Sequence, residues 1–543
     1  MAHDSPSTSS NRTATLGKVG ALLVFVALLC VPPPADMPPA AWRLAAVTLA
    51  MACLWITQAI PIAATSLVPL AAYPLLGIQS AEEVSKAYVD KYVILFLGGF
   101  IIALGIEKWG LHRRLALHIV RVLGTGLRRM VLGFMAATAF LSMWISNTAS
   151  TLLMLPIALA LAAEIREARS NDHSHGDAVR DDAAFDRFAT VLMIAIAYAA
   201  SIGGFTTLVG TPTNVAFQGI WAKRFPKAEY PGVPELSAGE WTLAVLPLGI
   251  AMLFCAWGLL TWRLPGRIGG RPLGRRFFTD RLRAMGRPSV AEWRMLAVFL
   301  ATAVLWIFRK PFRFGGTVLI PGWGDLVANG LSDWNVTAKM IHDSTVAIVM
   351  ALLMFVIPAK RSRNAPTEYL MDWKTAEKLP WGILLLIGGG FAIAGGFQQT
   401  ELDAWLAGEL SALVKDWPIW LVVAAVCFLL TFLTELTSNV ATVSTLLPVL
   451  AGTAIAIGVD PRLVMIPATI SASCAFMLPI ATPPNAIVFG SGKIRMGQMA
   501  SYGVVLNLIG VVLVTAATFL LLAPQLGVPL EGLPAWVGGT PGE

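Results

Sequence analysis

Residues 141–159, LSMWISNTASTLLMLPIAL, place a Ser-Asn-Thr triplet at 146–148 in the middle of an otherwise apolar stretch. The apolar run that surrounds the triplet, 131–162, is too long for one membrane crossing of about 20 residues. A second long run, 417–457, is interrupted in the same way by Thr-Ser-Asn at 437–439. In hydrocarbon, a break in the helix is tolerated only where protein buries it or where it lines a wet cavity. Both runs are therefore predicted to be hairpins that dip into the membrane and return.

The chain has the composition of an integral membrane protein. Of its 543 residues, 56 % are hydrophobic and 13 % are charged, whereas about a quarter of the residues of an ordinary soluble domain are charged. We predict about eleven membrane crossings, at residues 19–34, 41–58, 61–77, 91–108, 185–221, 241–263, 292–308, 343–358, 380–397, 461–490 and 498–523. The predicted fold class is an all-α membrane protein with about 11 transmembrane helices and two re-entrant hairpins.

The distribution of basic residues predicts the orientation. The net charge is +8, and most arginines lie in short links between apolar runs, where the positive-inside rule places them. These links share one face, the cytoplasmic one, only if the two interrupted runs do not cross the membrane. Hairpin 131–162 then enters from the cytoplasm and hairpin 417–457 enters from outside. Because topology accounts for the basic charge, no nucleic-acid partner is expected.

The two ends of the chain are predicted to lie on opposite sides of the membrane. Residues 1–18 are polar and are expected to form a disordered cytoplasmic tail, followed by an apolar run that lacks a convincing cleavage site and is retained as the first helix. Residues 525–543 contain no Lys or Arg, as expected of an external tail. We expect a multi-pass protein of a bacterial inner membrane, in contact with membrane lipid.

Three segments of the first half recur in the same order in the second half. The matched pairs are YVILFLGGFIIALGIEKWGLHRRLA (92–116) with WGILLLIGGGFAIAGGFQQTELDAWLA (381–407), ISNTASTLLMLP (145–156) with TSNVATVSTLLP (437–448), and VGTPTN (209–214) with IATPPN (480–485). In the first pair, Gly98 and Gly99 match Gly389 and Gly390. Under the orientation above, the two copies enter from opposite faces, which makes them inverted repeats. In secondary transporters built this way, broken helices from the two halves meet near the midplane around a substrate site.

Polar groups at these breaks suit two kinds of ligand. Unpaired carbonyls, together with the oxygens of Ser, Thr and Asn, suit a small cation such as Na⁺. Free amides at the starts of the returning helices favour a carboxylate, and Pro212 and Pro483 suit the first turn of a helix. A single Ser-Asn pair is more often a packing feature of a transmembrane helix, but two pairs at matching repeat positions favour a binding site.

Three further features limit the chemistry. Glu435 is the only carboxylate well inside the second hairpin; it could bind a cation or a proton, or it could brace the hairpin tip, and both interpretations stay open. No Lys or Arg lies at the centre of a predicted span, so a guanidinium is not expected to hold an anion. No His lies near the serine clusters, which argues against an intramembrane enzyme, and polar groups concentrated at two tips argue against a channel.

At these residues the sequence resembles the divalent anion/sodium symporter family, the solute-carrier-13-like transporters of dicarboxylates, citrate and sulfate. The resemblance runs from residue 40 to 524, and the paired Ser-Asn tips with GTPTN and ATPPN carry it. It implies a homodimer in which each protomer has a scaffold domain and a transport domain that moves as a rigid body, in an elevator motion. The scaffold is expected at residues 19–90 and 241–358, and the transport domain at residues 91–221 and 380–524.

The resemblance also assigns residues to two sodium sites and a substrate site, with two or more Na⁺ ions co-transported. The first sodium site is expected to use Ser142, Ser146, Asn147 and the backbone at Gly210. The second is expected to use Thr434, Thr437, Asn439 and the backbone at Ala481. The substrate carboxylates are expected to contact Ser146, Asn147, Thr148, Ser438, Asn439, Thr482 and Pro483.

One position departs from the family pattern. Some bacterial dicarboxylate members have Ser-Asn-Thr in both hairpins, whereas the second triplet here is Ser-Asn-Val, so Val440 can offer a substrate only its backbone amide. The leading expectation is Na⁺-coupled symport of a C4-dicarboxylate such as succinate, malate or fumarate. The alternatives are a Na⁺-independent dicarboxylate exchanger and a Na⁺-coupled transporter of citrate, tartrate or sulfate.

Overall fold

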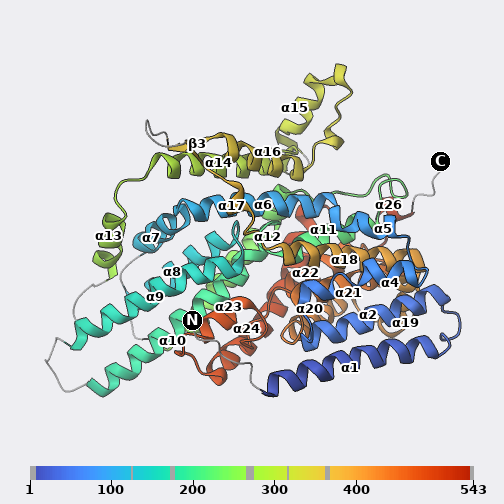
Figure 1. The fold of residues 1–543 in the computed structure, drawn as a ribbon, viewed down its shortest axis with the longest axis horizontal. Coiled ribbons are helices and arrows are strands. Elements are labelled where there is room, and N and C mark those ends of the chain that lie inside the picture. Colours follow the sequence, from blue (N-terminus) through green and yellow to red (C-terminus); the bar gives the residue numbers. More distant parts are fainter. Residues whose placement is uncertain are drawn as a thin grey trace.

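The computed structural model describes residues 8–123, 126–170, 178–264, 274–314, 317–360 and 367–538. Within these residues the fold is almost entirely helical (Figure 1). The strands form two small antiparallel pairs, β1 (Phe312–Phe314) with β2 (Thr317–Ile320) and β3 (Pro358–Lys360) with β4 (Glu368–Tyr369). The predicted all-α membrane fold class is therefore confirmed.

The N-terminal part differs from the prediction in two places. Its elements are α1 (Thr8–Cys30), α2 (Pro39–Thr57), α3 (Ile62–Thr65), α4 (Val68–Leu75), α5 (Ala81–Lys86), η1 (Ala87–Val89) and α6 (Lys91–Lys108). Residues 8–18, predicted as part of a disordered tail, are helical because α1 begins at Thr8; residues 1–7 lie outside the described residues. The span predicted at 61–77 is divided into α3 and α4 by a turn.

The first repeat and the helices after it follow in order. They are α7 (Leu111–Leu123), α8 (Leu127–Ser142), α9 (Asn147–Ser170), α10 (Ala178–Phe205), α11 (Pro212–Arg224), α12 (Ala238–Thr261), α13 (Gly274–Ala284), α14 (Val290–Ile307), α15 (Trp323–Gly330), η2 (Ser332–Trp334), η3 (Ala338–Met340) and α16 (Asp343–Val356). Helices α8 and α9 occupy the first predicted hairpin.

The second repeat has the same succession of elements. They are α17 (Trp373–Ala376), α18 (Trp381–Thr400), α19 (Leu402–Val414), α20 (Ile419–Leu433), α21 (Asn439–Ala456), α22 (Arg462–Ser471), α23 (Pro483–Phe489), α24 (Met496–Ala517), η4 (Thr518–Leu522), α25 (Ala523–Leu526) and α26 (Ala535–Gly538). Helices α20 and α21 occupy the second predicted hairpin, and residues 539–543 of the predicted external tail lie outside the described residues.

Fewer long helices are present than the predicted number of crossings. Within the described residues, nine helices are long and apolar enough to cross a membrane, or ten if α19 and α20, bent by 118°, count as one span. Two of the nine, α9 and α21, are hairpin arms. The spans predicted at 19–34, 61–77, 343–358 and 461–490 correspond to shorter apolar helices, since turns and breaks divide what the hydropathy joins.

The first hairpin has both of its ends at one end of the molecule. Near the start of α8, Arg128 donates hydrogen bonds to the carbonyl of Leu264, just beyond α12, at 2.8 and 2.9 Å. Near the end of α9, Arg166 lines one cavity together with Arg263. Both arms therefore end beside the segment that follows α12, so the chain returns to the side from which it came.

The second hairpin has both of its ends at another place. Ile419, the first residue of α20, and Val459, just beyond α21, pack against the same small apolar cluster, which consists of Leu463, Ala523 and Val528. The second hairpin therefore also returns to its starting side. Figure 1 shows α8 and α9 extending to the left of the molecule and α19 to α21 lying on the right.

Helix α24 separates the two hairpin bases. Its first turn adjoins the base of the first hairpin, because Gln498 lines the same cavity as Arg166 and Arg263. Its other end continues through η4 into α25, and Ala523 of α25 belongs to the cluster at the base of the second hairpin. With 22 residues, α24 is roughly 33 Å long, about the thickness of the hydrocarbon layer. The hairpins therefore start from opposite ends of a membrane-length helix, as inverted repeats require.

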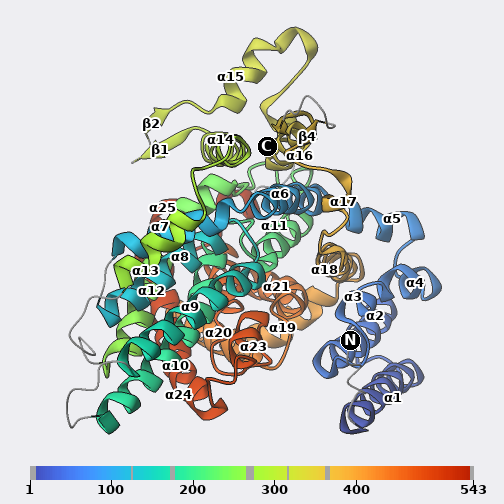
Figure 2. The ribbon, with the colours of Figure 1, turned by 60° about the vertical axis from the view of Figure 1, so that its left-hand side comes forward.

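The matched glycines of the repeat allow two helices to pack closely on their neighbours. A Cβ on Gly98 of α6 would lie 2.7 Å from the Cβ of Ala347 in α16, and a Cβ on Gly389 of α18 would lie 2.7 Å from the carbonyl oxygen of Ser66, at the end of α3. Helices α14 and α16 pack on α6, whereas α2 to α4 pack on α18. Figure 2 shows these two groups of helices on different sides of the molecule.

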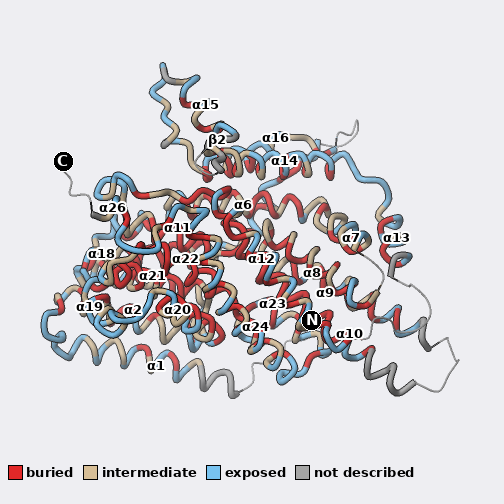
Figure 3. Tube along the Cα trace, turned by 180° about the vertical axis from the view of Figure 1, so that it is seen from behind, coloured by how far each residue is buried: buried red, intermediate tan, exposed pale blue. Residues whose placement is uncertain are grey.

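Helix α10 lies at the centre of the fold. All of its apolar stretch is buried, compared with a third of the apolar stretch of α24. It packs against both arms of the first hairpin, against α23 of the second repeat and against α12. Figure 3 shows buried residues gathered in the middle of the molecule, with α1 and α15 more exposed at its edges. The buried end of α10 is where the first helix break begins.

Candidate functional site

The tip of the first hairpin brings three oxygen atoms together. Ser142 ends α8, and its Oγ lies 2.6 Å from Oδ1 of Asn147, the first residue of α9, and 2.7 Å from the carbonyl oxygen of Ala200 in α10. The serine hydroxyl has one hydrogen and can donate it to one of the two acceptors at a time. A cluster with three oxygens and one hydrogen is rich in lone pairs, which is what a hard cation requires.

The break between α10 and α11 supports this tip. Thr207 Oγ1 donates a hydrogen bond to the carbonyl of Met143 in the tip and accepts one from the amide of Gly210 at 3.0 Å. The break is close to the cluster, because a Cβ on Gly204 would lie 2.2 Å from Asn147 Oδ1. A Cβ on Gly210 would lie 2.9 Å from the carbonyl oxygen of Ser142. The backbone must be glycine at both positions for the tip to approach.

The second hairpin repeats this arrangement. Thr434 directly follows α20, and its Oγ1 lies 2.6 Å from Oδ1 of Asn439, the first residue of α21, and 2.9 Å from the carbonyl oxygen of Ala472 beyond α22. One hydroxyl hydrogen again serves two acceptors. The structure therefore brings together the predicted residues Ser142 and Asn147 in one cluster, and Thr434 and Asn439 in another.

The asparagines of the GTPTN and ATPPN motifs brace the two breaks. Nδ2 of Asn214 donates to the carbonyls of Phe205 and Thr207 at 3.0 and 2.7 Å. Asn485 is the matching residue, and its Nδ2 donates to the carbonyls of Ala475 and Leu478 at 3.1 and 3.0 Å. Because these carbonyls would otherwise be unpaired at membrane depth, the motif asparagines stabilise the breaks and do not form part of either oxygen cluster.

The two breaks contact each other. Thr213 Oγ1 lies 2.8 Å from Ser473 Oγ, and both residues are buried. The Tyr198 ring of α10 packs on Phe476 with ring centroids 5.0 Å apart, and its hydroxyl donates to the carbonyl of Met499 in α24 at 3.1 Å. Each hairpin tip therefore rests on its own break, and the breaks join the two halves.

Other predicted residues lie at the tips with different partners. Ser146 precedes α9, and its Oγ accepts a hydrogen bond from the Ala149 amide at 3.3 Å. The Thr437 hydroxyl lies 2.5 Å from Oγ1 of Thr442 and donates to the Leu433 carbonyl. The Thr437 hydroxyl is therefore hydrogen-bonded within its own hairpin, and Thr437 stays a predicted ligand of the second sodium site.

The predicted substrate residues lie at the starts of helices. Thr148, Ser438 and Asn439 are half-buried, whereas Val440 is buried and Pro483 is exposed. The side chain of Ser438 caps no amide of α21, so the first amides of that helix remain available to an anion. Ala481 is half-buried directly before Thr482, whose side chain accepts from the Asn485 amide at 3.4 Å.

Sequence reasoning missed the two backbone carbonyls of the clusters, Ala200 and Ala472. Neither alanine has a side chain that could signal a ligand. The only clue is an Ala-Ser pair that lies within α10 at 200–201 and directly after α22 at 472–473. Among the described residues, no group of three or more His, Cys, Asp or Glu side chains could hold a metal ion. Neutral oxygens are thus the cation ligands that the described part of the chain offers at the tips.

Glu435, whose role the sequence left open, hydrogen-bonds to groups outside the oxygen cluster. Its carboxylate accepts hydrogen bonds from the amides of Met477 and Leu478 at 2.8 and 2.9 Å and from Nδ2 of Asn507 at 2.8 Å. All three donors belong to the second break or to α24. This geometry favours the bracing interpretation.

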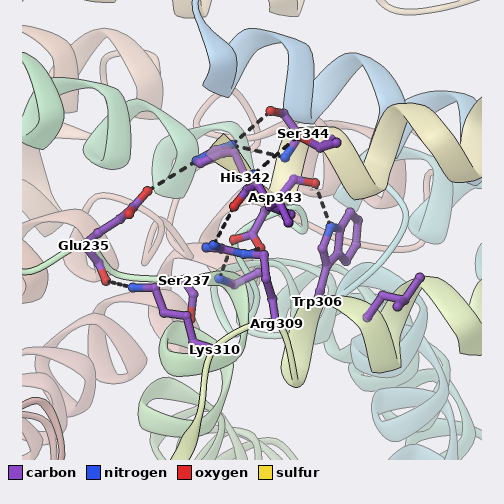
Figure 4. Close-up of polar contacts among 12 residues, drawn as sticks. Glu235, Ser237, Trp306, Arg309, Lys310, His342, Asp343 and Ser344 are labelled. Atoms are coloured by element: carbon purple, nitrogen blue, oxygen red, sulfur yellow. Dashed lines mark hydrogen bonds and ion pairs between the residues drawn. The ribbon is translucent and has the colours of Figure 1, made fainter. Parts of the chain in front are cut away.

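A separate charged cluster lies at the end of the bundle predicted to be external (Figure 4). A buried ion pair joins Arg309 to Asp343, and Asp343 Oδ2 also accepts from the amide of Ala238, at the start of α12, at 3.0 Å. Lys310 donates to the carbonyl of Glu235. The positive-inside rule does not favour basic residues on the external side, but two of those in this link, Arg309 and Lys310, are held by local partners that tie α12, α14 and α16 together.

Two pKa values in this cluster are lowered, one by neighbouring charges and the other by burial. Burial alone raises the pKa of the Glu235 carboxyl, but Lys310, Lys91 and Lys227 outweigh burial and lower that pKa to about 2. Burial lowers the pKa of the His342 imidazole to about 4, against the opposing effect of the neighbouring Asp343. The folded protein therefore holds Glu235 charged and His342 neutral at neutral pH.

The lowered pKa of His342 should make the free energy of unfolding depend on pH. Its Nδ1 accepts a hydrogen bond from the Ser344 amide at 3.1 Å, which caps α16 and requires the neutral ring. The unfolded chain takes up a proton at this ring below a pH of about 6.5, but the folded protein does so only below about 4. The free energy of unfolding should therefore fall as the pH falls from about 6.5 to about 4, by up to about 3 kcal/mol.

Thermal unfolding of the purified protein across this pH range measures the effect. His342→Asn keeps a capping oxygen but does not titrate, so its unfolding midpoint should fall less than that of the wild type. His118→Asn changes an exposed histidine of α7 and should behave like the wild type. An identical pH dependence in His342→Asn and the wild type would contradict the assignment.

The family model and the relatives that match this chain are all named as sodium-coupled transporters. A family model described as the sodium:sulfate symporter transmembrane region matches residues 12–523. The sodium-dependent dicarboxylate transporter SdcS of Staphylococcus saprophyticus is 38 % identical over 523 residues, which cover 95 % of this chain and 94 % of the relative. SdcS of Staphylococcus aureus strain RF122 is 38 % identical over 520 residues, covering 95 % and 92 %.

A solved structure supports the fold alone. The structure of Neisseria gonorrhoeae MtrF, described as illuminating a class of antimetabolite efflux pumps, aligns with a TM-score of 0.52 at 12 % identity. The alignment covers 96 % of this chain and 97 % of that one. The similarity therefore extends over the whole helical architecture, at an identity too low to carry site residues across.

Proposed function

The chain belongs to the sodium:sulfate symporter family, and from this premise we propose that it is a Na⁺-coupled symporter of a C4-dicarboxylate such as succinate, malate or fumarate. Membership of the family makes it a multi-pass membrane transporter and not an enzyme. The relatives named above are sodium-dependent dicarboxylate transporters, which supports both the ion and the class of anion.

The observation that carries the proposal is the pair of matched oxygen clusters. Ser142 with Asn147, and Thr434 with Asn439, each place a hydroxyl 2.6 Å from an amide oxygen, with a backbone carbonyl as third member. Without a cation, lone pairs in such clusters repel each other; a Na⁺ ion at each cluster would remove that repulsion. Two clusters support the co-transport of two or more ions.

The anion is proposed to bind between the tips. Candidate contacts are Ser146, Asn147, Thr148, Ser438, Asn439, Val440, Thr482 and Pro483. Amides at the starts of α9 and α21 would attract the two carboxylates, and the bound Na⁺ ions would add positive charge. The bound ions would couple Na⁺ to the anion, because at empty clusters the oxygen lone pairs would repel the carboxylates and oppose the attraction of the helix amides.

An elevator motion in a homodimer is proposed for the transport step. The transport domain would include both tips and both breaks, which the contact between Thr213 and Ser473 joins, so that the clusters move together. Helices α6 and α18 would border the scaffold, where Gly98 and Gly389 pack against it. The orientation proposed is a cytoplasmic N-terminus and an external C-terminus in a bacterial inner membrane.

Uptake into proteoliposomes tests the proposed function. Radiolabelled succinate should accumulate when an inward Na⁺ gradient is imposed, and should not accumulate when choline replaces Na⁺. Unlabelled malate and fumarate should compete with it, whereas citrate, tartrate and sulfate should compete weakly. Uptake that is unchanged without Na⁺ and is stimulated by internal dicarboxylate would establish the exchanger instead, and strong competition by sulfate or citrate would replace the substrate class.

Val440→Thr should change the ranking of substrates more than the Na⁺ dependence. Val440 follows Asn439 in the first turn of α21 and is buried. Threonine has a similar volume to valine and would add one hydroxyl, which we expect close to the proposed substrate and not in the Thr434 cluster. A new hydrogen bond to a carboxylate would strengthen binding by about 1.5 to 3 kcal/mol. Competition profiles of the two proteins, measured at one Na⁺ concentration, should differ; identical profiles would exclude this residue as a selectivity position.

A further inference from the structure

A large basic cavity lies away from both hairpin tips. Its volume is about 890 Å³. It is lined by the end of α9, the first half of α10, the end of α12, the residues just before α24 and the first turns of α24. No residue of either oxygen cluster lines it. The cavity is at the base of the first hairpin, the end of the bundle that the positive-inside rule places in the cytoplasm.

Among the lining residues that the structure describes, five are cations and one is a carboxylate. The cations are Arg166, Arg187, Arg263, Lys493 and Arg495, and the carboxylate is that of Asp186. Five positive charges and one negative charge leave a net charge of +4. None of the five forms an ion pair with any carboxylate whose side chain the structure describes. A bound anion would relieve their mutual repulsion.

Hydrogen bonds from side chains to backbone carbonyls fix the positions of these charges relative to one another. Arg187 donates to the carbonyl of Arg263 at 3.4 Å, which joins α10 to the end of α12. Thr190 Oγ1 donates to the carbonyl of Lys493 at 3.1 Å, which joins α10 to the segment before α24. The cations therefore come from separate elements that are held together, and they form a cavity rather than a row along one helix.

Part of the cavity wall is apolar, and the surface beside the cavity is of the kind that faces lipid. Leu159, Val191, Met193 and Leu259 are among the lining residues. Trp262, at the rim, is 62 % exposed, as expected of an aromatic residue at the level of the headgroups. The exposed faces of α12 and α24 next to it carry the large apolar side chains Ile250, Phe254, Leu508 and Val512.

We propose that this cavity binds the phosphate headgroup of an anionic phospholipid from the cytoplasmic leaflet, with the acyl chains along the exposed faces of α12 and α24. Basic pockets between transmembrane helices on the cytoplasmic side recognise such headgroups. Free phosphate would satisfy the cations equally well, but it would make no use of the apolar walls or of the lipid-facing surface that adjoins them. The combination of the two surfaces assigns the lipid as the source of the phosphate.

Binding to the full-length protein in a neutral detergent tests the proposal. Native mass spectrometry would compare phosphatidylglycerol, phosphatidylcholine and inorganic phosphate. Phosphatidylglycerol should bind, and the other two should bind at least about tenfold more weakly, which corresponds to about 1.4 kcal/mol. Equal binding of phosphatidylcholine would overturn the requirement for negative charge, and equal binding of inorganic phosphate would overturn the lipid source.

Charge-neutralising variants locate the site. Arg263→Gln with Lys493→Gln should weaken phosphatidylglycerol binding by about 30-fold, or about 2 kcal/mol for two cations near the membrane surface. Arg276→Gln with Arg283→Gln removes the same charge from exposed positions of α13 outside the cavity and should leave binding within about twofold of wild type. Equal losses in the two double variants, or no loss in the first, would overturn the proposal. Because all four side chains are exposed, each variant is expected to fold.

Discussion

Replacing Asn147 or Asn439 by alanine is expected to abolish Na⁺-driven uptake while leaving the protein folded. Each substitution removes the amide oxygen that lies 2.6 Å from a hydroxyl in its cluster, at Ser142 or Thr434. Loss of one hydrogen-bonding or coordinating oxygen for a charged group costs about 1.5 to 3 kcal/mol, which is a loss of roughly 10- to 150-fold in ion affinity. Because the anion is proposed to depend on both ions, weakening either site alone should be enough to stop Na⁺-driven uptake.

Three controls separate ion binding from folding. Asn329→Ala changes an exposed asparagine of α15 and should transport like the wild type. Asn147→Asp keeps an oxygen at the same place and should retain more Na⁺-dependent thermal stabilisation than Asn147→Ala. Gly204→Ala leaves Asn147 intact but places a Cβ where its Oδ1 lies, and should also weaken Na⁺ binding. Wild-type uptake by both alanine variants would refute the site.

The hairpins and their polar tips could be predicted from the sequence for a physical reason. A Ser-Asn pair in hydrocarbon must be paired or solvated, and its recurrence at the same place in both halves makes a chance origin implausible. Asn147 and Asn439 could be identified as a pair in this way. Ser142 and Thr434 have no such signal of their own, and they were assigned through the family resemblance; the structure places both in the clusters.

Other features could not be predicted, because they depend on packing. Every residue has a carbonyl oxygen, so only the fold shows that those of Ala200 and Ala472 complete the clusters. Hydropathy joined residues 61–77 into one span, although a turn divides them into α3 and α4. The polar composition of residues 8–18 suggested disorder. Several of these residues have a low helix propensity, but none is a proline, and α1 extends through them.

The two segments assigned to the scaffold are a further feature that could not be predicted from the sequence. Residues 19–90 and 241–358 were assigned to one scaffold by resemblance, and the sequence gives no indication that they contact the rest of the protomer at separate places, α2 to α4 on α18 and α14 with α16 on α6. Helix α12 packs instead on α10 and α24. The division into scaffold and transport domains stays a prediction, and the position of α12 is where it is most open to test.

Glu435→Gln is expected to destabilise the protein and not merely to uncouple it. The carboxylate of Glu435 is buried and accepts three hydrogen bonds, from the amides of Met477 and Leu478 and from Asn507 Nδ2. Glutamine replaces one accepting oxygen by an NH₂ group, which would face a donor. An unsatisfied buried donor costs about 1 to 3 kcal/mol, and at a break in mid-membrane no water compensates for it.

The first repeat supports a structural role for this acid. Met143 occupies the position in the first tip that Glu435 occupies in the second, one residue after Ser142 or Thr434. The first tip attaches to its break through the Met143 carbonyl, which accepts from Thr207. The second tip makes the corresponding attachment with a side chain. Both repeats therefore tie tip to break at the same place, and the first does so without an acid.

Thermal unfolding and uptake together distinguish a brace from a proton carrier. If Glu435 braces the tip, Glu435→Gln should lower the unfolding midpoint with and without Na⁺, and the fraction that remains folded should still show Na⁺-dependent uptake with an unchanged pH profile. Glu409→Gln, at an exposed position of α19, removes the same charge and should alter neither property. If Glu435→Gln is instead as stable as the wild type and its uptake has lost its pH dependence, Glu435 binds a proton during transport. A residue that only braces the tip would change the stability of the protein before it changed which ion drives uptake.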